Sequence, residues 1–283
     1  MLHLDTHAAL TATTASWRGA EESVGFVPTM GALHAGHLSL VGAARAACDR
    51  VVVSVFLNPT QFAPTEDLDT YPSDLARDRG MLEEARVDAF FTTTPDVMYP
   101  PGYATWVSVE GLTDRLCGAS RDGHFRGVTT VVTKLLNLVG PCHAFFGEKD
   151  RQQLIVLRRM VADLNLPVTV VGCPIVREPD GLALSSRNAY LDSEERRRAL
   201  ALSAGLRAAE EAFASGVHSG AALEAAVRER LEAVQAEVEY VELVDPDSLA
   251  RLEAATAGAI LAVAARVGKT RLIDNHALGR PWA

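Results

Sequence analysis

The stretch "VGFVPTMGALHAGHL", residues 24–38, joins a short apolar run to a glycine-containing turn and then to a helical pattern. Residues 24–27 have the continuous apolar character of a strand that is buried on both faces. The glycines let the chain leave that strand and enter a helix at about Gly36. Two imidazoles, His34 and His37, stand at this junction. A strand followed by a helix predicts the first unit of a parallel sheet.

The same alternation continues along the next 140 residues. A helix is predicted over residues 36–48, another is marked by apolar residues at helical spacing from Val128 to Val139, and a third spans residues 150–164. The predicted strands are "VVVSVFL" (51–57), "DAFFTTT" (88–94), "HAFFG" (143–147) and "VTVV" (168–171). We therefore expect residues 1–175 to form a Rossmann-like, doubly wound α/β domain with a parallel sheet.

The composition of the sequence changes after about residue 176. Ala- and Glu-rich helices are predicted at 193–215 and 219–235. They precede the strand candidates "VEYVELV" (238–244), "AILAVAARV" (259–267) and "TRLID" (270–274). Residues 176–283 are therefore predicted to form a smaller C-terminal α+β domain that acts as a lid, with the boundary within residues 176–188.

Composition narrows the classes of function. The chain has 283 residues, 48% of them hydrophobic and 6% aromatic, which suits a globular core and offers few rings for stacking on bases. Its formal net charge of −9 argues against broad attraction to a phosphate backbone, so no nucleic-acid partner is expected.

The cysteines and the N-terminus point to a reducing compartment. Four cysteines are scattered without a C-x-x-C pair, so neither a zinc site nor a disulfide framework is predicted. The first residues carry no basic segment, and no uncharged apolar run approaches the roughly 18 residues of a membrane span. A cytoplasmic protein without a membrane partner is expected.

The turn that contains the histidines is a candidate anion site. In open α/β sheets, ligands bind beyond the carboxyl ends of the strands, and helix N-termini present free N–H groups there. His34 and His37 would add donors beside a phosphate. Two other interpretations of the pair remain open, a zinc site that lacks an evident third ligand and a pair of structural histidines. Neither G-x-G-x-x-G nor the Walker spacing is present.

Longer motifs make the candidate function specific. "HAGH" resembles the H-x-G-H signature of adenylyl-transferring nucleotidyltransferases, which class I aminoacyl-tRNA synthetases share. Together with four further motifs in the same order, the chain resembles the pantoate–β-alanine ligase (pantothenate synthetase) family over nearly its whole length. These motifs are "FVPTMGALHAGHLSLV", "VVVSVFLNPTQFAPTEDLDTYP", "GHFRGVTTVVTKLLNLV", "FFGEKDRQQL" and "DGLALSSRNAYL".

The resemblance implies a two-step reaction. The carboxylate of (R)-pantoate attacks the α-phosphate of MgATP to give pantoyl adenylate and pyrophosphate. The amine of β-alanine then attacks the acyl carbon, giving pantothenate and AMP. The implied partners are these three small molecules and a second copy of the chain, as a homodimer. Mg²⁺ is expected to arrive with ATP and keep several waters, without a dedicated protein site.

The resemblance also assigns roles to individual residues. His37 takes the position of proton donor, and His34, Lys149 and Arg187 contact the phosphates as further catalytic residues. The implied ATP-site residues are Met30, Gly31, Ala32, Leu33, His34, Ala35, Gly36, His37, Gly147, Glu148, Lys149, Asp150, Val176, Leu184, Ser185, Ser186 and Arg187. The implied substrate residues are Asn58, Gln61 (also near β-alanine), Phe62, Met30 and Gln153, the last in the turn after "GEKD".

Some features stay outside this assignment. His124 is interpreted as part of a helix entry near the site, without a catalytic role. Asp67, Asp69, Asp74 and Asp78 suggest either a magnesium site or, more simply, a solvated charged face. Segment 182–188 is either a mobile phosphate-binding loop or a polar linker between domains. Ser73 and Asp122 depart from residues common in the family, which affects local loop contacts only.

Other functions compete with this interpretation. A second H-x-G-H adenylyltransferase, acting on a phosphorylated precursor, would need a basic cluster where Gln61 and Gln153 lie. A tRNA synthetase would need a basic extension, which this short acidic chain lacks. A nucleotide-binding regulator that keeps the fold without turnover is the non-enzymatic alternative.

Overall fold

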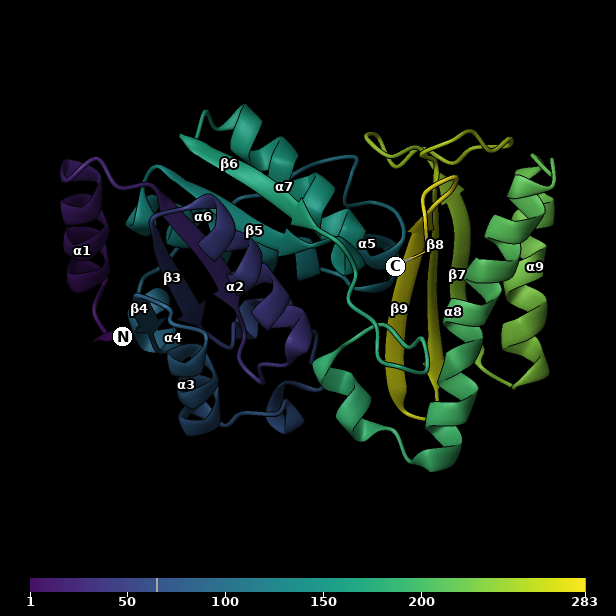
Figure 1. Ribbon diagram of the computed structural model, residues 1–283, viewed down its shortest axis with the longest axis horizontal. Helices are drawn as coiled ribbons and strands as arrows, with labels where there is room; N and C mark the ends of the chain where they lie inside the picture. The colour runs from purple at the N-terminus through teal and green to yellow at the C-terminus, as the bar shows by residue number, and fades with distance from the viewer. Residues whose placement is uncertain (65, 283) are drawn as a thin grey trace.

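A computed structural model describes residues 1–64 and 66–282 of the chain. A six-stranded parallel sheet has the strand order β1-β4-β3-β2-β5-β6, and a three-stranded antiparallel sheet follows it as β7-β8-β9 (Figure 1). The strands are β1 (Leu2–Leu4), β2 (Val24–Thr29), β3 (Arg50–Val55), β4 (Ala89–Thr92), β5 (Cys142–Gly147), β6 (Val168–Cys173), β7 (Glu237–Val244), β8 (Ile260–Val267) and β9 (Thr270–Ala277). This arrangement confirms the predicted fold class.

The helices correspond to the predicted patterns, with several additions. The predicted ones are α2 (Ala35–Ala47), α6 (His124–Val139), α7 (Arg151–Asp163), α8 (Ser193–Ala214) and α9 (Gly220–Ala233). Not predicted were β1, α1 (His7–Gly19), α3 (Leu75–Glu84), α4 (Pro95–Met98), α5 (Cys117–Ser120) and the 3₁₀ turns η1 (Pro59–Gln61), η2 (Leu68–Thr70), η3 (Glu148–Asp150) and η4 (Ser186–Tyr190). Among the helices described, none combines the length and apolarity that a membrane span requires.

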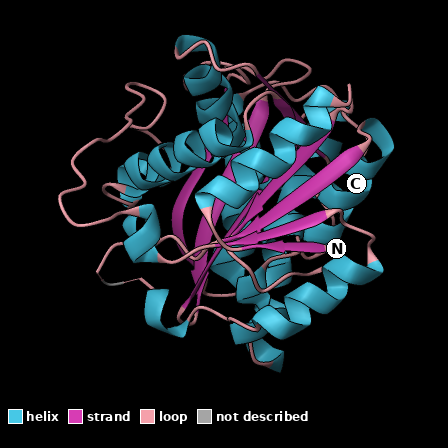
Figure 2. Cartoon of the chain, turned by 90° about the vertical axis from the view of Figure 1, so that its left-hand side faces the viewer, coloured by secondary structure: helices cyan, strands magenta, loops and turns pink. Residues whose placement is uncertain are grey.

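Helices cover both faces of the parallel sheet (Figure 2). Successive strand residues point to opposite faces, so neighbours such as Phe90 and Phe91 belong to different cores. Phe91 packs with residues of α1, α6 and α7, whereas Phe90 packs with residues of α2 and α3. Burial on both faces explains why these strands are continuous apolar runs instead of alternating ones.

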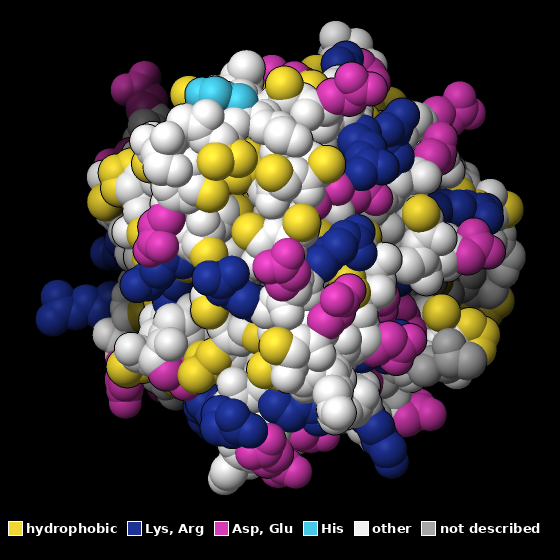
Figure 3. Space-filling model, turned by 90° about the vertical axis from the view of Figure 1, so that its right-hand side faces the viewer, with side chains coloured by type: hydrophobic (Ala, Val, Ile, Leu, Met, Phe, Trp, Pro, Cys, Tyr) yellow, Lys and Arg dark blue, Asp and Glu magenta, His cyan; other side chains and the backbone are white. Residues whose placement is uncertain are grey.

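The antiparallel sheet is also buried on both faces. Along β8, Leu261 and Val263 pack with α8 and α9, while Ile260, Ala262 and Ala264 pack against residues of α5, α6 and α7. Figure 1 shows this sheet standing between the parallel sheet and the two long helices. On the outer face of these helices, basic and acidic side chains are interspersed (Figure 3). An apolar core therefore joins the two sheets, and the domain boundary within residues 176–188 stays a prediction.

A close backbone contact fixes helix α6 against the turn η1. At Gly127, an added Cβ would lie 2.4 Å from the carbonyl oxygen of Thr60 and 2.7 Å from the Cα of Gln61. Only glycine permits this approach, because both obstructing groups are backbone. The contact places Gln61 on the wall of the cavity described below.

We expect Gly127→Ala to lower the free energy of unfolding by about 1–3 kcal/mol, since η1 must move to accept the methyl group. Urea denaturation measures the change. Gly42→Ala on α2 is the matched control, because nothing lies within 4 Å of its Cβ position. That variant should be neutral or more stable by up to about 1 kcal/mol, and equal stability of the two variants would contradict the rigid contact.

Candidate active site

The site lies where β2 and β5 run side by side in the parallel sheet. The chain turns from β2 toward β3 on one side and from β5 toward β6 on the other, so this is the switch point of the fold. The His34–His37 turn follows β2, and η3 follows β5. A cavity of about 240 Å³ opens at these carboxyl ends and is lined by both segments.

The two histidines hold the first turn of helix α2. His34 is the N-cap, and its Nδ1 accepts a hydrogen bond from the backbone N–H of Gly36 at 3.1 Å. His37 reaches back, and its Nδ1 accepts from the backbone N–H of His34 at 3.3 Å. The imidazole centroids are 4.1 Å apart. The structural role that the sequence left open is therefore present, and both rings also line the cavity.

These hydrogen bonds fix the tautomers. A backbone N–H can only donate, so the Nδ1 atoms of His34 and His37 carry no proton, and each neutral ring carries it on Nε2. Burial, with Lys149 as the next cause, lowers the pKa of His34 to about 4. Burial and the neighbouring His34 lower the pKa of His37 to about 3. At neutral pH the ligand-free site thus offers two uncharged donors, and His37 is not a charged acid there.

A carboxylate on α3 shapes the turn before the histidines. Asp78 is 1% exposed and accepts the backbone N–H groups of Ala32 and Leu33 at 3.0 and 2.8 Å. Gly31 and Ala32 have positive φ angles of 93° and 52°. The left-handed region is unfavourable for alanine, and the two hydrogen bonds to Asp78 stabilise it there. Asp78 is therefore a structural acceptor.

Lys149 and Arg187 supply the positive charge. Lys149 lies in η3 and lines the cavity, 3.8 Å from an Asp150 oxygen. Arg187 lies in η4, where its guanidinium makes two hydrogen bonds to the carboxylate of Asp67, at 2.9 and 2.8 Å. It also stands over the ring of Tyr71 at 5.7 Å. Arg187 thus reaches the site already paired with an acidic partner.

Segment 176–188 forms a compact hairpin that closes one side of the cavity. Arg177 and Ala183 form an antiparallel bridge, and Leu182 is 4% exposed, so the segment is not a plain solvated linker. Ser186 donates to the carbonyl of Ala32 at 3.3 Å, which joins the hairpin to the histidine turn.

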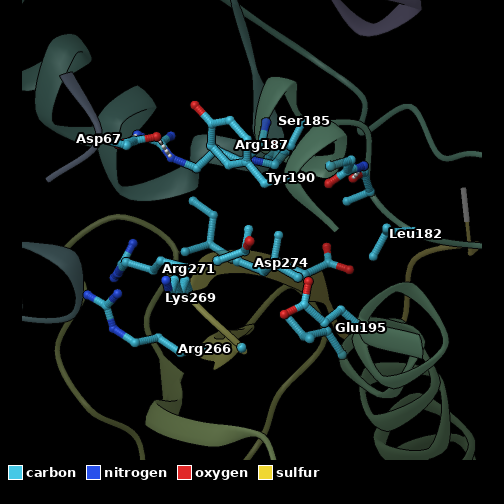
Figure 4. A pocket seen from close by; sticks show the side chains of 18 of the residues that line it. Asp67, Leu182, Ser185, Arg187, Tyr190, Glu195, Arg266, Lys269, Arg271 and Asp274 are labelled. Carbon is cyan, nitrogen blue, oxygen red and sulfur yellow. Dashed lines mark hydrogen bonds and ion pairs between the residues drawn. The ribbon is translucent and has the colours of Figure 1, made fainter. Parts of the chain in front are cut away.

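Beyond this hairpin the cavity opens into a wider cleft of about 780 Å³. Figure 4 shows Asp67, Arg187 and Tyr190 on one side of this cleft and basic residues of the β8–β9 hairpin on the other. Cleft and cavity share Lys149 and Arg187, so they adjoin at these two side chains.

Amide side chains line the opposite wall. Gln61, at the end of η1, is 9% exposed, and its Nε2 donates to the sulfur of Met30 at 3.0 Å. Gln153 also lines the cavity and lies in the first turn of helix α7, which corrects its expected place in a turn. Asn58 is 1% exposed and lines the cavity, yet its carbonyl and both amide hydrogens are engaged by protein groups. Asn58 therefore has no group free to bind a substrate.

Comparison with known proteins identifies the kind of site. A family model described as pantoate-beta-alanine ligase matches residues 3–277. The chain belongs to the pantoate–β-alanine ligase family. A relative from Pelotomaculum thermopropionicum, named pantothenate synthetase, is 50% identical over 99% of this chain and 100% of its own. The chain is thus an enzyme of the ligase class.

Solved structures agree with this membership. The crystal structure of pantothenate synthetase from Thermus thermophilus has a TM-score of 0.93 and 50% identity, covering 98% of this chain and 99% of that one. A ligase from Francisella tularensis, complexed with beta-gamma ATP and beta-alanine, has a TM-score of 0.84 and 32% identity over the full length of both chains.

Most residues that the family resemblance implies meet at this cavity. The lining residues among them are Met30, His34, Gly36, His37, Asn58, Gln61, Phe62, Gly147, Lys149, Asp150, Gln153, Val176, Leu184, Ser185, Ser186 and Arg187. Five others do not line it, namely Gly31, Ala32, Leu33, Ala35 and Glu148. Leu33 is 1% exposed and packs in the core, and Glu148 is paired with Arg151. Ala35 is exposed, so these five do not form one supporting layer.

Sequence reasoning missed Arg121, which links several parts of the wall. Its guanidinium makes two hydrogen bonds to Glu66, at 2.6 and 2.8 Å, and one to Nε2 of His124 at 2.9 Å. Because arginine only donates, Nε2 of His124 accepts, and its Nδ1 donates to the carbonyl of Gln61 at 2.8 Å. His124 begins α6, as predicted, and holds the Gln61 backbone in place. Its tautomer is opposite to that of the two turn histidines.

The four aspartates of segment 67–78 serve separate purposes. Asp67 pairs with Arg187, Asp74 caps α3 and Asp78 holds the histidine turn, while Asp69 is exposed. The solvated-face interpretation therefore fits Asp69, and the other three carboxylates have partners within the protein. Within residues 1–64 and 66–282, no group of three or more His, Cys, Asp or Glu side chains is arranged to hold a metal ion. These residues do not fit a protein-built metal cage.

Three histidines with lowered pKa values predict a fall in stability with acid. His34, His37 and His124 are neutral in the folded protein, the last because burial and Arg121 lower its pKa to about 4. Unfolding returns the pKa of each histidine to the ordinary value of 6.5. Below that pH the unfolded chain therefore binds more protons than the folded protein, which stabilises the unfolded state relative to the folded one. The free energy of unfolding should fall as pH drops from about 6.5 to 4, by up to about 1.4 kcal/mol per pH unit for each histidine.

Urea denaturation at several pH values measures this slope. His124→Asn should reduce it, because the variant removes one of the groups that must charge on unfolding. His143→Asn, at an exposed position of β5, is the matched control and should leave the slope unchanged. An identical slope in all three proteins would contradict the assignment of neutral His124.

Proposed function

We propose that this chain condenses (R)-pantoate with β-alanine at the expense of ATP, through pantoyl adenylate, releasing pyrophosphate and AMP. The single observation that supports it is the convergence of the histidine turn, η3, the 176–188 hairpin and the two glutamines on one cavity. Family membership supplies the reaction, and the cavity supplies groups suited to each part of it.

In the first step, a pantoate carboxylate oxygen attacks the α-phosphorus of ATP, and the bond to the bridging oxygen of pyrophosphate breaks. Negative charge grows on the α-phosphate oxygens and on the leaving group. The Nε2–H groups of His34 and His37 and the ammonium of Lys149 are fixed donors for that charge. A bound polyphosphate raises the pKa of both imidazoles, which brings His37 toward its proposed role as proton donor.

In the second step, the neutral amine of β-alanine attacks the acyl carbon, and AMP leaves with the bonding electron pair. The amine loses a proton as the amide forms, and a phosphate oxygen of the departing AMP accepts it. The apolar wall of α6, including Val131 and Leu135, with Met30 and Phe62, suits the geminal methyl groups of pantoate. Gln153 offers an amide to its hydroxyls. The buried wall also keeps water away from the reactive adenylate.

Arg187 takes pyrophosphate in this proposal by leaving Asp67. The guanidinium already presents two parallel N–H donors to a carboxylate, and a phosphate accepts the same pair of bonds. The hairpin 176–188 and the C-terminal domain then act as the lid over the substrates.

The remaining parts of the proposal rest on the family resemblance. Mg²⁺ enters bound to ATP as part of the substrate, with waters in place of a protein cage. We also propose a homodimer and a cytoplasmic location.

An AMP-release assay with ATP, Mg²⁺, pantoate and β-alanine, each omitted in turn, tests the reaction. If an acyl adenylate forms, pantoate alone should support exchange of labelled pyrophosphate into ATP. Exchange that strictly requires β-alanine would contradict the two-step route. ATP binding without any AMP release would favour a regulator that has lost turnover.

The double role of His37 predicts different outcomes for two substitutions. His37→Ala should cut single-turnover AMP formation by roughly 10²–10³-fold, and should cost about 1 kcal/mol of stability because the helix cap is lost. His37→Asn keeps a cap acceptor without the Nε2–H donor, so it should be nearly as stable as the unchanged protein and just as slow. An Asn variant with full turnover would overturn the catalytic assignment.

A further inference from the structure

The orientation of the Gln61 side chain is decided by Asn58, which the backbone of Thr60 and Gly127 and the hydroxyl of Tyr99 hold in place. A carboxamide presents an acceptor on one side and two donors on the other, and turning it over exchanges them. Which side faces the substrate therefore decides what Gln61 can recognise. The backbone around Asn58, three residues earlier, settles this question.

Asn58 is held in one orientation by two backbone groups. Its Oδ1 lies 3.4 Å from the backbone nitrogen of Thr60, which can only donate. Its Nδ2 lies 3.2 Å from the carbonyl oxygen of Gly127, which can only accept. A turned amide would bring a donor against a donor and an acceptor against an acceptor, so one orientation remains.

The orientation of Asn58 then fixes Gln61. Asn58 Nδ2 also donates to the side-chain oxygen of Gln61 at 3.0 Å. The side-chain nitrogen of Gln61 must therefore point away, toward Met30 and the cavity. One of its hydrogens reaches the Met30 sulfur, a weak acceptor, and the other has no partner in the described part of the chain. The backbone carbonyl of Gln61 is held as well, by Nδ1 of His124.

Tyr99 completes this arrangement from behind the wall. Its hydroxyl donates to Asn58 Oδ1 at 2.8 Å, shorter than the contact from the Thr60 backbone, and the Thr60 hydroxyl donates to the same oxygen at 2.9 Å. Tyr99 follows α4, packs among Phe56, Tyr103 and Trp106, and does not line the cavity. Burial raises the pKa of Tyr99 to about 12, so it remains a donor throughout the physiological range.

We propose that Tyr99 is a positioning residue which, through Asn58, holds Gln61 with its N–H donors facing the substrate. Gln61, which the family resemblance already places at the substrates, then presents donors to an acceptor oxygen of pantoate and does not hold the ammonium of β-alanine, which has only donors to offer. This inference rests on the proposed function for the identity of the substrates. The fixed orientation itself rests on the hydrogen bonds alone.

Two kinetic variants test the assignment. Tyr99→Phe should raise the KM for pantoate about three- to tenfold, leaving the KM for ATP and for β-alanine unchanged, because one of the donors to Asn58 is lost. Tyr103→Phe is the matched control, since the Tyr103 hydroxyl makes no hydrogen bond to the residues described, and it should change none of the three. Gln61→Glu keeps the acceptor for Asn58 but presents a carboxylate to the cavity, so the KM for pantoate should rise more than about 30-fold.

The opposite assignment gives the opposite result. If Gln61 held the ammonium group, Gln61→Glu would lower the KM for β-alanine, and that outcome with an unchanged KM for pantoate would overturn the proposal. A uniform rise in all three KM values for Tyr99→Phe would mean a general structural role and would also overturn it.

The side-chain amide resonances of the ligand-free protein separate this inference from the proposed function. With ¹⁵N labelling, the Gln61 amide is assigned by its loss in Gln61→Glu and the Asn58 amide by its loss in Asn58→Asp. Tyr99→Phe should shift both, and Tyr103→Phe should shift neither. If the unchanged protein releases no AMP, the proposed function is refuted, while the shifts in Tyr99→Phe still support the positioning of Gln61 by Tyr99 through Asn58. If neither resonance shifts in Tyr99→Phe, that positioning role is overturned whatever the turnover.

Discussion

Strands β2 and β5 lie side by side, and the chain leaves their carboxyl ends in opposite directions. The connection from β2 to β3 and the connection from β5 to β6 therefore diverge above the same edge of the sheet and leave room between them. In the described sheet, no other pair of neighbouring strands has connections that diverge in this way. The histidine turn follows one strand and η3 follows the other, so the donors and the charge of the site converge although more than a hundred residues separate them. Every other part of the wall, from α6 to the 176–188 hairpin, is packed around that opening.

Stability and chemistry share the same atoms at this edge. The Nδ1 atoms of His34 and His37 cap helix α2, and this use of one ring nitrogen decides that the other carries the proton. A charged imidazole would lose the cap, because a protonated Nδ1 cannot accept a backbone N–H. The helix end thus keeps the pair neutral in the ligand-free protein, and in our proposal the bound polyphosphate favours the charged form.

The sequence was a good guide to the sheet and a poor guide to the partners of individual side chains. Runs such as "VVVSV" and "AFF" are apolar on both faces, so the strands, their parallel arrangement and the place of the histidine turn follow from pattern and position. Helix α1 gave little signal, because its buried face holds only Leu10, Thr14 and Trp17 among alanines and threonines. The capping role of the histidines, the Asp67–Arg187 pair and the orientation of Asn58 each depend on an atom from a distant or backbone group, which no spacing along the chain reveals.

The proposed function requires an acidic chain to bind anionic substrates. The net charge of −9 gives no long-range attraction. Of the three cationic side chains that line the cavity, Arg187 is paired with Asp67 and Arg121 with Glu66 before any ligand binds. In our proposal, recognition depends on short-range donors whose directions are set in advance: the Nε2–H groups of two neutral imidazoles and the amide nitrogen of Gln61. Such donors cost little reorganisation when charge develops, and they favour the transition state more than the ground state. Backbone groups that can only donate or only accept are what fix those directions, so the precision of the site originates in the main chain of α2, η1 and α6.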